Sequence, residues 1–194
     1  MKKQTLDVKE LIHIGIFTAI YFMVIAIPGI LGIIPIFMLL LPAMIGFLGA
    51  IPIMLLIAKT QKFGALTILC LIINILLIIG GHPWIALIYS IPVTVIADYI
   101  MARGHYQNTK LNALGYIIFS MWSIGNLLPF YFMRQTFLAH LAERHGSHYE
   151  QTVAMLFSYQ MIPVLIILTI IGAWLGYIIA TTVLRKHFKR AGMI

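Results

Sequence analysis

The sequence predicts an all-α integral membrane protein with six transmembrane helices, and three observations lead to that fold class. Of the 194 residues, 62% are hydrophobic and only 9% are charged, whereas a soluble domain has about 25% charged residues. The mean hydropathy is +1.03. The apolar residues form runs of roughly 20, the length with which an α-helix crosses a bilayer. This composition excludes a soluble enzyme, a nucleic-acid-binding domain and a disordered regulator.

Five apolar runs predict one span each, and a sixth run is ambiguous. The six predicted helices cover residues 11–27, 33–58, 63–79, 83–101, 111–132 and 153–184, within a single transmembrane domain over residues 1–194. The second run contains Pro35, Pro42 and Pro52, so it is one kinked helix or two short pieces. Membrane helices tolerate proline where neighbouring groups bond the freed carbonyls. The only cysteine, Cys70, lies inside an apolar run, which excludes a disulfide framework.

The basic residues favour a single span over residues 33–58. Cytoplasmic loops of membrane proteins carry the excess of Lys and Arg. With six spans, eleven of the 13 basic residues lie on the side of both termini: Lys2, Lys3, Lys9, Lys59, Lys62, Arg103, Lys110, Arg185, Lys186, Lys189 and Arg190. Only Arg134 and Arg144 lie outside. Splitting the second span would leave five inside and eight outside. We therefore expect six spans with both termini in the cytoplasm.

The longest loop on the predicted outer side covers residues 133–152. Residues 134–145 are expected to form a short helix, which Gly146 ends. The apolar residues on one face of this helix are Phe137, Leu138 and Leu141. Ser147 and Glu150 have the spacing of a capping box. We therefore expect the last helix to begin there, outside the membrane.

Polar and aromatic side chains on the outer side predict a binding pocket. Amides inside spans are functional candidates, outer histidines can ligate a metal or a haem iron, and the arginines can pair with carboxylates. The candidate binding residues are His82, Trp84, Asn126, Tyr131, Arg134, His140, His145, His148, Tyr159 and Gln160. His82 is the first candidate for an iron ligand, because Gly80, Gly81 and Pro83 fix its turn. Solvated loop histidines and the aromatic belt of a membrane interface are the alternative interpretation.

Small residues at four-residue spacing predict close helix packing in three places. The pairs are Gly15/Ala19, Gly46/Ala50 and Gly172/Gly176. Such spacing lets two helices approach closely, because packing drives association in lipid. The spacing alone does not separate internal packing from docking on a partner, so both interpretations stay open for Gly15 and Ala19.

One acidic residue, Asp98, lies inside a predicted span. It is about one helical turn from the inner end and near Arg103, so we expect it to pair with that residue or to reach the surface. A single carboxylate at this depth argues against a proton-driven secondary transporter.

Several stretches point to one family of transport proteins. The chain has no G-x-x-x-x-G-K-[ST] phosphate loop, so it is not expected to hydrolyse ATP. It opens with KELIHIGIFTAIY at residues 9–21, continues with KTQKFG at 59–64 after Pro52, and closes the fourth helix with Ala97-Asp98. With these features, nearly the whole chain resembles the substrate-binding S components of energy-coupling factor (ECF) transporters, in the Trep_Strep or MptD-like branch.

The resemblance implies a mechanism and partners. An S component binds cargo from outside and then topples in the membrane against a transmembrane coupling subunit, which two cytoplasmic ATPases drive. An A-x-x-x-A pair on the first helix docks on that subunit, and Gly15 and Ala19 have this spacing here. The chain is thus expected to be a multi-pass protein of the bacterial cytoplasmic membrane, with no catalytic residues, no permanent cofactor and no nucleic-acid partner.

The cargo stays open at this point. The branch includes haem import by Gram-positive bacteria, and haem suits the four outer histidines, the methionines and the aromatic faces. Arg134 and Arg144 suit its propionates. A vitamin or vitamin precursor is the alternative cargo, followed by a bare metal ion. A stand-alone secondary transporter is a more distant alternative, because no internal repeat is visible.

Overall fold

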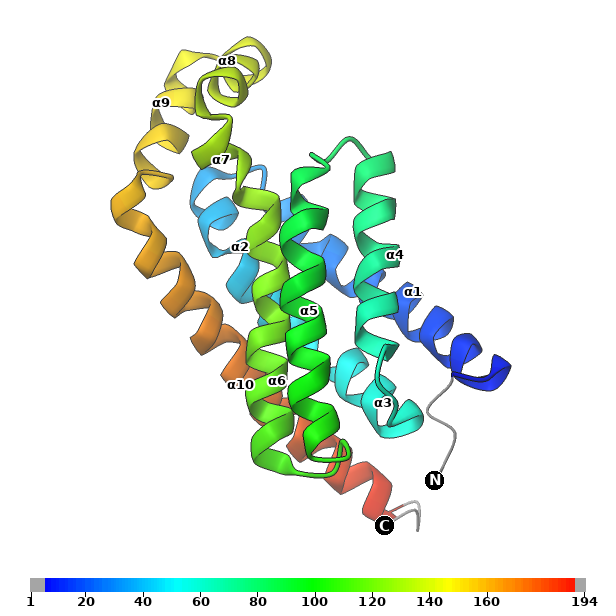
Figure 1. Ribbon diagram of the computed structural model, residues 1–194. Helices are drawn as coiled ribbons and strands as arrows, with labels where there is room; N and C mark the ends of the chain where they lie inside the picture. Colours follow the sequence, from blue (N-terminus) through cyan, green and yellow to red (C-terminus); the bar gives the residue numbers. More distant parts are fainter. Residues whose placement is uncertain (1–5, 191–194) are drawn as a thin grey trace.

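The computed structural model describes residues 6–190, with side chains through residue 186, and its regular structure is helical (Figure 1). The elements are α1 Val8–Leu31, α2 Pro35–Leu48, α3 Ala50–Thr60, α4 Ala65–Ile79, α5 Ile85–Arg103, α6 Thr109–Ser120, η1 Met121–Leu127, α7 Pro129–Phe132, α8 Arg134–His145, α9 Ser147–Leu156, η2 Tyr159–Met161 and α10 Ile162–Arg190. Lys2, Lys3 and the side chains of Lys189 and Arg190, all used in the charge argument, lie outside the described part.

Within the described residues, four helical stretches are long and apolar enough to cross a membrane. They are Val8–Leu31, Pro35–Thr60, Ile85–Arg103 and Tyr159–Lys186, and Ala65–Ile79 is a shorter apolar helix. Every backbone polar group in a bilayer must be satisfied internally, which helices achieve. The protein is therefore an all-α membrane protein, as the sequence predicts.

Helix α1 starts at a capping box and runs further than predicted. The Asp7 side chain accepts the Glu10 N–H at 2.9 Å, and the Glu10 side chain accepts the Asp7 N–H at 2.9 Å. Glu10 also pairs with Lys62 at 2.7 Å. The predicted end of the first helix at residue 27 is wrong, because the helix continues through buried Pro28 to Leu31. In apolar surroundings, continued helix satisfies backbone groups that a loop would leave unpaired.

The ambiguous stretch over residues 33–58 consists of two helices that meet at Gly49. Pro35 occupies the first position of α2, where its missing N–H costs nothing. A Cβ on Gly49 would come within 2.5 Å of the Tyr21 ring and 2.8 Å of the Ile45 carbonyl oxygen. Pro52 removes an N–H from the first turn of α3. The helix therefore breaks at Gly49, because a side chain there would collide with Tyr21 and because Pro52 has no N–H to donate.

The predicted helix over residues 111–132 changes to a tighter 3₁₀ turn at η1. The Ser90 hydroxyl on α5 donates to the Trp122 carbonyl at 3.0 Å, and a Cβ on Gly125 would come within 3.0 Å of the Ala86 carbonyl. The Trp122 indole donates to the Tyr21 hydroxyl at 2.9 Å. The Ser90 bond and the close approach at Gly125 hold the turn against α5, and the Trp122 indole ties it to α1. A 3₁₀ stretch inside a long helix often marks a functional region.

The predicted continuous helix over residues 153–184 is wrong. Helix α9 ends at Leu156, Ser158 is extended with ψ 155°, and α10 begins at Ile162. Pro163 lies in the first turn of α10, where the missing N–H of a proline leaves no helical hydrogen bond unmade, as for Pro35 in α2. The capping box of Ser147 and Glu150 is also absent, because Gly146 at φ +87° occupies the cap position without a side-chain bond. The predicted helix over residues 134–145 is confirmed as α8.

Asp98 neither pairs with Arg103 nor reaches the surface, so that expectation is wrong. It is fully buried and accepts the Gly64 N–H at 2.8 Å and the Tyr106 hydroxyl at 2.7 Å. Arg103 instead donates to the Tyr99 hydroxyl and lies 4.9 Å over that ring. Burial and the Asp98 charge raise the pKa of the Tyr106 hydroxyl. The carboxylate therefore ties the start of α4 to the α5–α6 loop.

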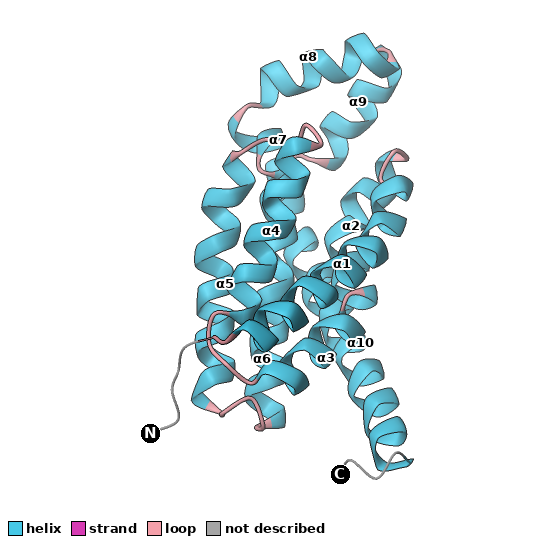
Figure 2. Cartoon of the chain, turned by 90° about the vertical axis from the view of Figure 1, so that its right-hand side faces the viewer, coloured by secondary structure: helices cyan, strands magenta, loops and turns pink. Residues whose placement is uncertain are grey.

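The helices place two distinct ends on the molecule. Figure 1 shows α7, α8, α9 and the α4–α5 turn at one end, and the α3–α4 turn, the α5–α6 loop and the end of α10 at the other. Helices α8 and α9 lie above the bundle in Figure 2. Helix α10 packs against α2, α3 and α6. Sequence-distant segments thus meet at both ends.

Candidate functional site

A cavity of about 380 Å³ opens between η1–α7 and the first turns of α10, at the end that carries α8 and α9. Its volume is within the range of small-molecule sites. Its lining is aromatic and aliphatic: Tyr89, Met121, Ile124, Leu128, Tyr131, Phe132, Tyr159, Ile162, Leu165 and Ile166. The two walls come from segments that are about 35 residues apart in sequence, and the breaks at η1 and η2 allow them to face each other.

Two of the predicted binding residues, Tyr131 and Tyr159, meet in this cavity. Their ring centroids are 5.7 Å apart, and the Tyr159 hydroxyl donates to the Tyr131 carbonyl at 3.3 Å. The Tyr131 hydroxyl is buried and makes no hydrogen bond within residues 6–190. An unsatisfied buried polar group costs about 1–3 kcal/mol. A ligand that offers this hydroxyl a partner would recover that energy.

Arg134 holds the α8–α9 hairpin at its base. Its guanidinium donates to the Phe157 carbonyl at 2.7 Å and to the Ala154 carbonyl at 2.7 Å. These carbonyls end α9, where a cation is favourable. Phe130 stacks on Phe157 with centroids 4.2 Å apart, next to this bond. Arg134 is therefore engaged in the structure, and its predicted pairing with a cargo carboxylate stays a prediction.

A second bond fixes the far side of the hairpin. The Tyr149 hydroxyl on α9 donates to the Ile33 carbonyl in the α1–α2 turn at 2.8 Å. A tyrosine hydroxyl is protonated at neutral pH in any case, and burial raises the pKa of Tyr149 further. The face of α8 that carries Phe137, Leu138 and Leu141 packs on the core below it. The predicted outer loop is thus a packed helical cover beside the cavity.

The predicted histidines do not converge. His82 and Trp84 are exposed in the α4–α5 turn, and His140, His145 and His148 are exposed on α8 and α9. His140 lies 3.5 Å from Glu143, and the His145 ring packs 4.7 Å from the Tyr149 ring. Within the described residues, no three His, Cys, Asp or Glu side chains form a metal-binding group. Haem-iron ligation by His82 stays a prediction.

The two predicted amides lie outside the lining of the cavity. Asn126 is on η1 with a buried side-chain oxygen that has no partner among the described groups, and Gln160 is exposed on η2. Sequence reasoning missed most lining residues, including Tyr89 and Leu128. The phenol of Tyr89 inside an apolar span was the one signal that could have indicated a site.

The small-residue pairs differ in what surrounds them. Gly15 and Ala19 are exposed on α1, and a Cβ on Gly15 would meet nothing within 4 Å. In contrast, a Cβ on Gly46 would lie 3.2 Å from Ala173, and one on Gly176 would lie 2.5 Å from the Phe47 carbonyl oxygen. The Gly46 and Gly176 positions are therefore filled by the protein itself. The α1 pair is open.

A family comparison agrees with this description of a membrane bundle. The family model described as "Hypothetical bacterial integral membrane protein (Trep_Strep)" matches residues 8–190. This chain belongs to the Trep_Strep family. The match extends from the first residue of α1 to the last residue of α10, so the matched region of this chain contains the cavity, the α8–α9 hairpin and the open face of α1. Neither a curated protein nor a solved structure matches the chain.

Proposed function

We propose that this Trep_Strep protein is the substrate-binding S component of an ECF-type importer in the bacterial cytoplasmic membrane. In this proposal the helical segments form six spans with both termini in the cytoplasm. The cavity beside the α8–α9 hairpin takes cargo from outside. A transmembrane coupling subunit with two cytoplasmic ATPases drives delivery, and the chain itself performs no catalysis.

The open face of α1 is the observation that carries the proposal. Gly15 and Ala19 occupy the four-residue spacing of a close helix contact, and no part of the described chain covers Gly15. The neighbouring apolar residues Leu11, Ile12 and Ile16 are also exposed. Small residues flatten a helix surface so that another backbone can approach. A flat strip on the outside of the bundle suits a partner helix.

The cavity supports a cargo that is mostly apolar and contains at least one hydrogen-bonding group. Aromatic walls from Tyr131 and Tyr159 suit a flat ring, and the unpartnered Tyr131 hydroxyl suits a polar atom. Haem is the cargo that we propose first, because tyrosine oxygen is among the protein ligands of haem iron. A vitamin or vitamin precursor is the alternative, and the dispersed histidines favour it over haem.

Docking can be tested by placing a larger side chain on the open face of α1. Gly15→Leu or Ala19→Leu should abolish co-purification with the coupling subunit and ATPases and should leave cargo binding intact. Gly29→Leu is the matched control, because Gly29 is on the same helix and an added Cβ there also meets nothing within 4 Å. It lies about 21 Å along the axis from Gly15. If all variants co-purify normally, α1 does not dock and the S-component proposal fails.

Cargo binding can be tested by titrating the purified protein with haemin. The Soret band of haemin should shift and sharpen on binding, with saturation at one equivalent, and its position should differ in Tyr131→Phe, which keeps the ring and removes the oxygen. A difference in His82→Ala instead would move the ligand to the α4–α5 turn. If the protein does not change the haemin spectrum, haem is excluded, and mass spectrometry of small molecules retained by the protein then tests the vitamin alternative.

Topology can be tested by thiol labelling in whole cells. Cys70 is buried, so the background is low. A cysteine at exposed Ser147 should label from outside. A cysteine at exposed Gln107 should label only after permeabilisation. Gln107 is chosen over its neighbour Asn108 because the Asn108 side chain caps α6. The reverse pattern contradicts the orientation and places the cavity on the cytoplasmic side.

A further inference from the structure

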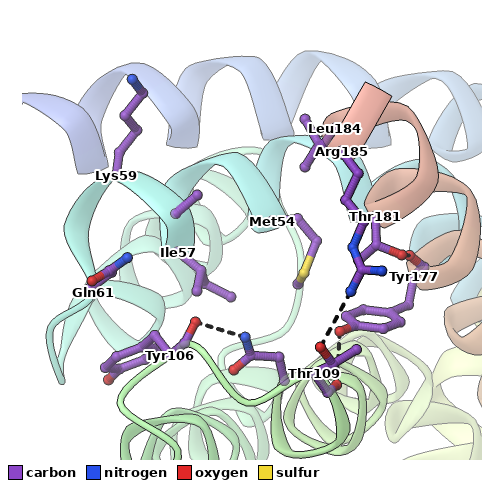
Figure 3. Close-up of a pocket in the computed structure, with 12 residues that line it drawn as sticks. Met54, Ile57, Lys59, Gln61, Tyr106, Thr109, Tyr177, Thr181, Leu184 and Arg185 are labelled. Atoms are coloured by element: carbon purple, nitrogen blue, oxygen red, sulfur yellow. Dashed lines mark hydrogen bonds between the residues drawn. The ribbon is translucent and has the colours of Figure 1, made fainter. Parts of the chain in front are cut away.

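A second cavity, of about 620 Å³, lies at the opposite end of the molecule, where α3, the α5–α6 loop, α6 and α10 meet (Figure 3). It is separate from the cavity beside α8 and α9, and the import mechanism proposed above does not use it. Its walls combine an arginine, a lysine, hydroxyls and two amides with apolar side chains. This combination indicates an amphipathic ligand.

Lys59 and Arg185 are the cations in the lining of this cavity, and the proposal rests on Arg185. Figure 3 shows its side chain extending from α10 toward Thr109. Among the described residues, its guanidinium makes one long hydrogen bond of 3.5 Å, from Nη2 to the Thr109 hydroxyl oxygen. A guanidinium has five N–H donors in a fixed fork, and the others make no bond within the described residues. This fork matches the oxygens of a phosphate.

Asn112 supplies an acceptor. Its Nδ2 donates to the Tyr106 carbonyl at 2.8 Å, which fixes the orientation of the amide. Its Oδ1 is buried and makes no bond with the described part of the chain. An unpaired buried acceptor favours a ligand with a hydroxyl donor. Arg185 and Asn112 together therefore favour a ligand that has both a phosphate and a hydroxyl.

The remaining walls and the position indicate a lipid. Met54, Ile57 and Leu184 provide apolar surface. Ile178, which precedes Thr181 by one turn on the cavity side of α10, is exposed and continues this surface toward the spanning part. The apolar stretches of α3 and α10 end at Thr60 and Lys186, so the cavity is at the depth of lipid headgroups. Basic pockets between membrane helices bind anionic headgroups.

We propose that this cavity binds the phosphoglycerol headgroup of an anionic phospholipid, with the phosphate on Arg185, the glycerol hydroxyl on Asn112 and an acyl chain along α10. The site requires that α3 and α10 span the membrane and does not depend on which cargo is imported. A lipid wedged between α3, α6 and α10 would stabilise the end of α10 against the bundle.

The test is native mass spectrometry of the full chain released from nanodiscs that contain phosphatidylglycerol and phosphatidylcholine in equal amounts. The protein should retain phosphatidylglycerol. Arg185→Gln should lower this retention about tenfold, the value of one charge-assisted bond. Arg185→Lys keeps the charge but not the fork, so its retention should lie between those of the wild type and Arg185→Gln. Arg103→Gln removes the same charge from the same end outside the cavity and should leave retention unchanged.

The hydroxyl contact has its own test, since phosphatidic acid carries a phosphate without the glycerol headgroup. The wild-type chain should prefer phosphatidylglycerol over phosphatidic acid, and Asn112→Leu should remove that preference. Equal retention of phosphatidylcholine, or an equal loss in Arg103→Gln and Arg185→Gln, would overturn the proposal. If soluble glycerol 3-phosphate stabilises the protein through Arg185 and phosphatidylglycerol is not retained, the ligand is a soluble phosphoester and the lipid assignment is wrong.

Discussion

Helix α1 and the α2–α10 contact carry small residues at the same spacing but have opposite surroundings. At the α2–α10 contact, Gly46 faces Ala173, and Gly172 and Gly176 face the backbone of α2 at Ala43 and Phe47. On α1, Gly15 faces open space. The first group is part of the internal packing of the protein. The second is available to lipid or to another chain.

The difference shows that a small-residue motif has no fixed role. Close packing between membrane helices depends on van der Waals contact, so an added methyl group destabilises the protein only where a neighbour already occupies the space. The Tyr116 hydroxyl also donates to the Gly46 carbonyl at 2.6 Å, which joins α6 to the same contact. Large substitutions at the α2–α10 contact should therefore impair folding, whereas large substitutions on the exposed face of α1 should impair association with a partner.

The largest effect is expected from Gly176→Leu. A Cβ at this position would lie 2.5 Å from the Phe47 carbonyl oxygen and 2.7 Å from the Gly46 carbonyl oxygen, and backbone atoms cannot move aside as a side chain can. The isobutyl group would force α2 and α10 apart. We expect no monodisperse protein by size-exclusion chromatography in detergent. Recovery of a normal monomer would mean that the two helices do not pack as described.

A smaller loss is expected from Gly172→Ala. Its Cβ would collide with the backbone of Ala43, and overpacking of this kind costs about 1–3 kcal/mol. Gly46→Ala should cost less, because its Cβ would lie 3.2 Å from Ala173 and needs only a small shift. Thermal unfolding followed by tryptophan fluorescence ranks the two. An equal melting temperature for both variants and wild type contradicts this ranking.

The smallest effect is expected from Gly15→Ala, with the opposite sign. Alanine in a helix interior is more stable than glycine by about 0.5–1 kcal/mol, and nothing opposes the added methyl group. The variant should melt at or slightly above the wild-type temperature and should still co-purify with partner subunits, because alanine keeps the surface flat. A clear drop in melting temperature would show that α1 is covered.

Much of the fold follows from the sequence, because apolar runs of sufficient length must become helices in a bilayer. The short helix from Arg134 to His145 also followed from composition and Gly146. The break between Leu156 and Ile162 did not, since it depends on bonds from Arg134, which is about twenty residues earlier in the chain. The burial of Asp98 likewise depends on a loop tyrosine and on the first residues of α4.

The candidate site was less accessible to sequence reasoning. Tyr131 and Tyr159 were expected at the same level of the membrane, and the structure brings their rings together through the turns at η1 and η2. Most other lining residues are aliphatic and resemble any membrane helix residue in sequence. The exposure of Gly15 and the enclosure of Gly172 depend on the rotation of each helix against its neighbours, which spacing does not encode.

The position of Arg134 has a mechanical consequence. Arg134 is the first residue of α8, and the carbonyls of Ala154 and Phe157, to which it donates, are at the end of α9. The Arg134 side chain thus links the start of α8 to the end of α9. The stacked rings of Phe130 and Phe157 lie at the base of the hairpin, next to this link. The two helices separate only when both bonds break. Movement of the whole hairpin also requires the Tyr149 bond to the Ile33 carbonyl to break.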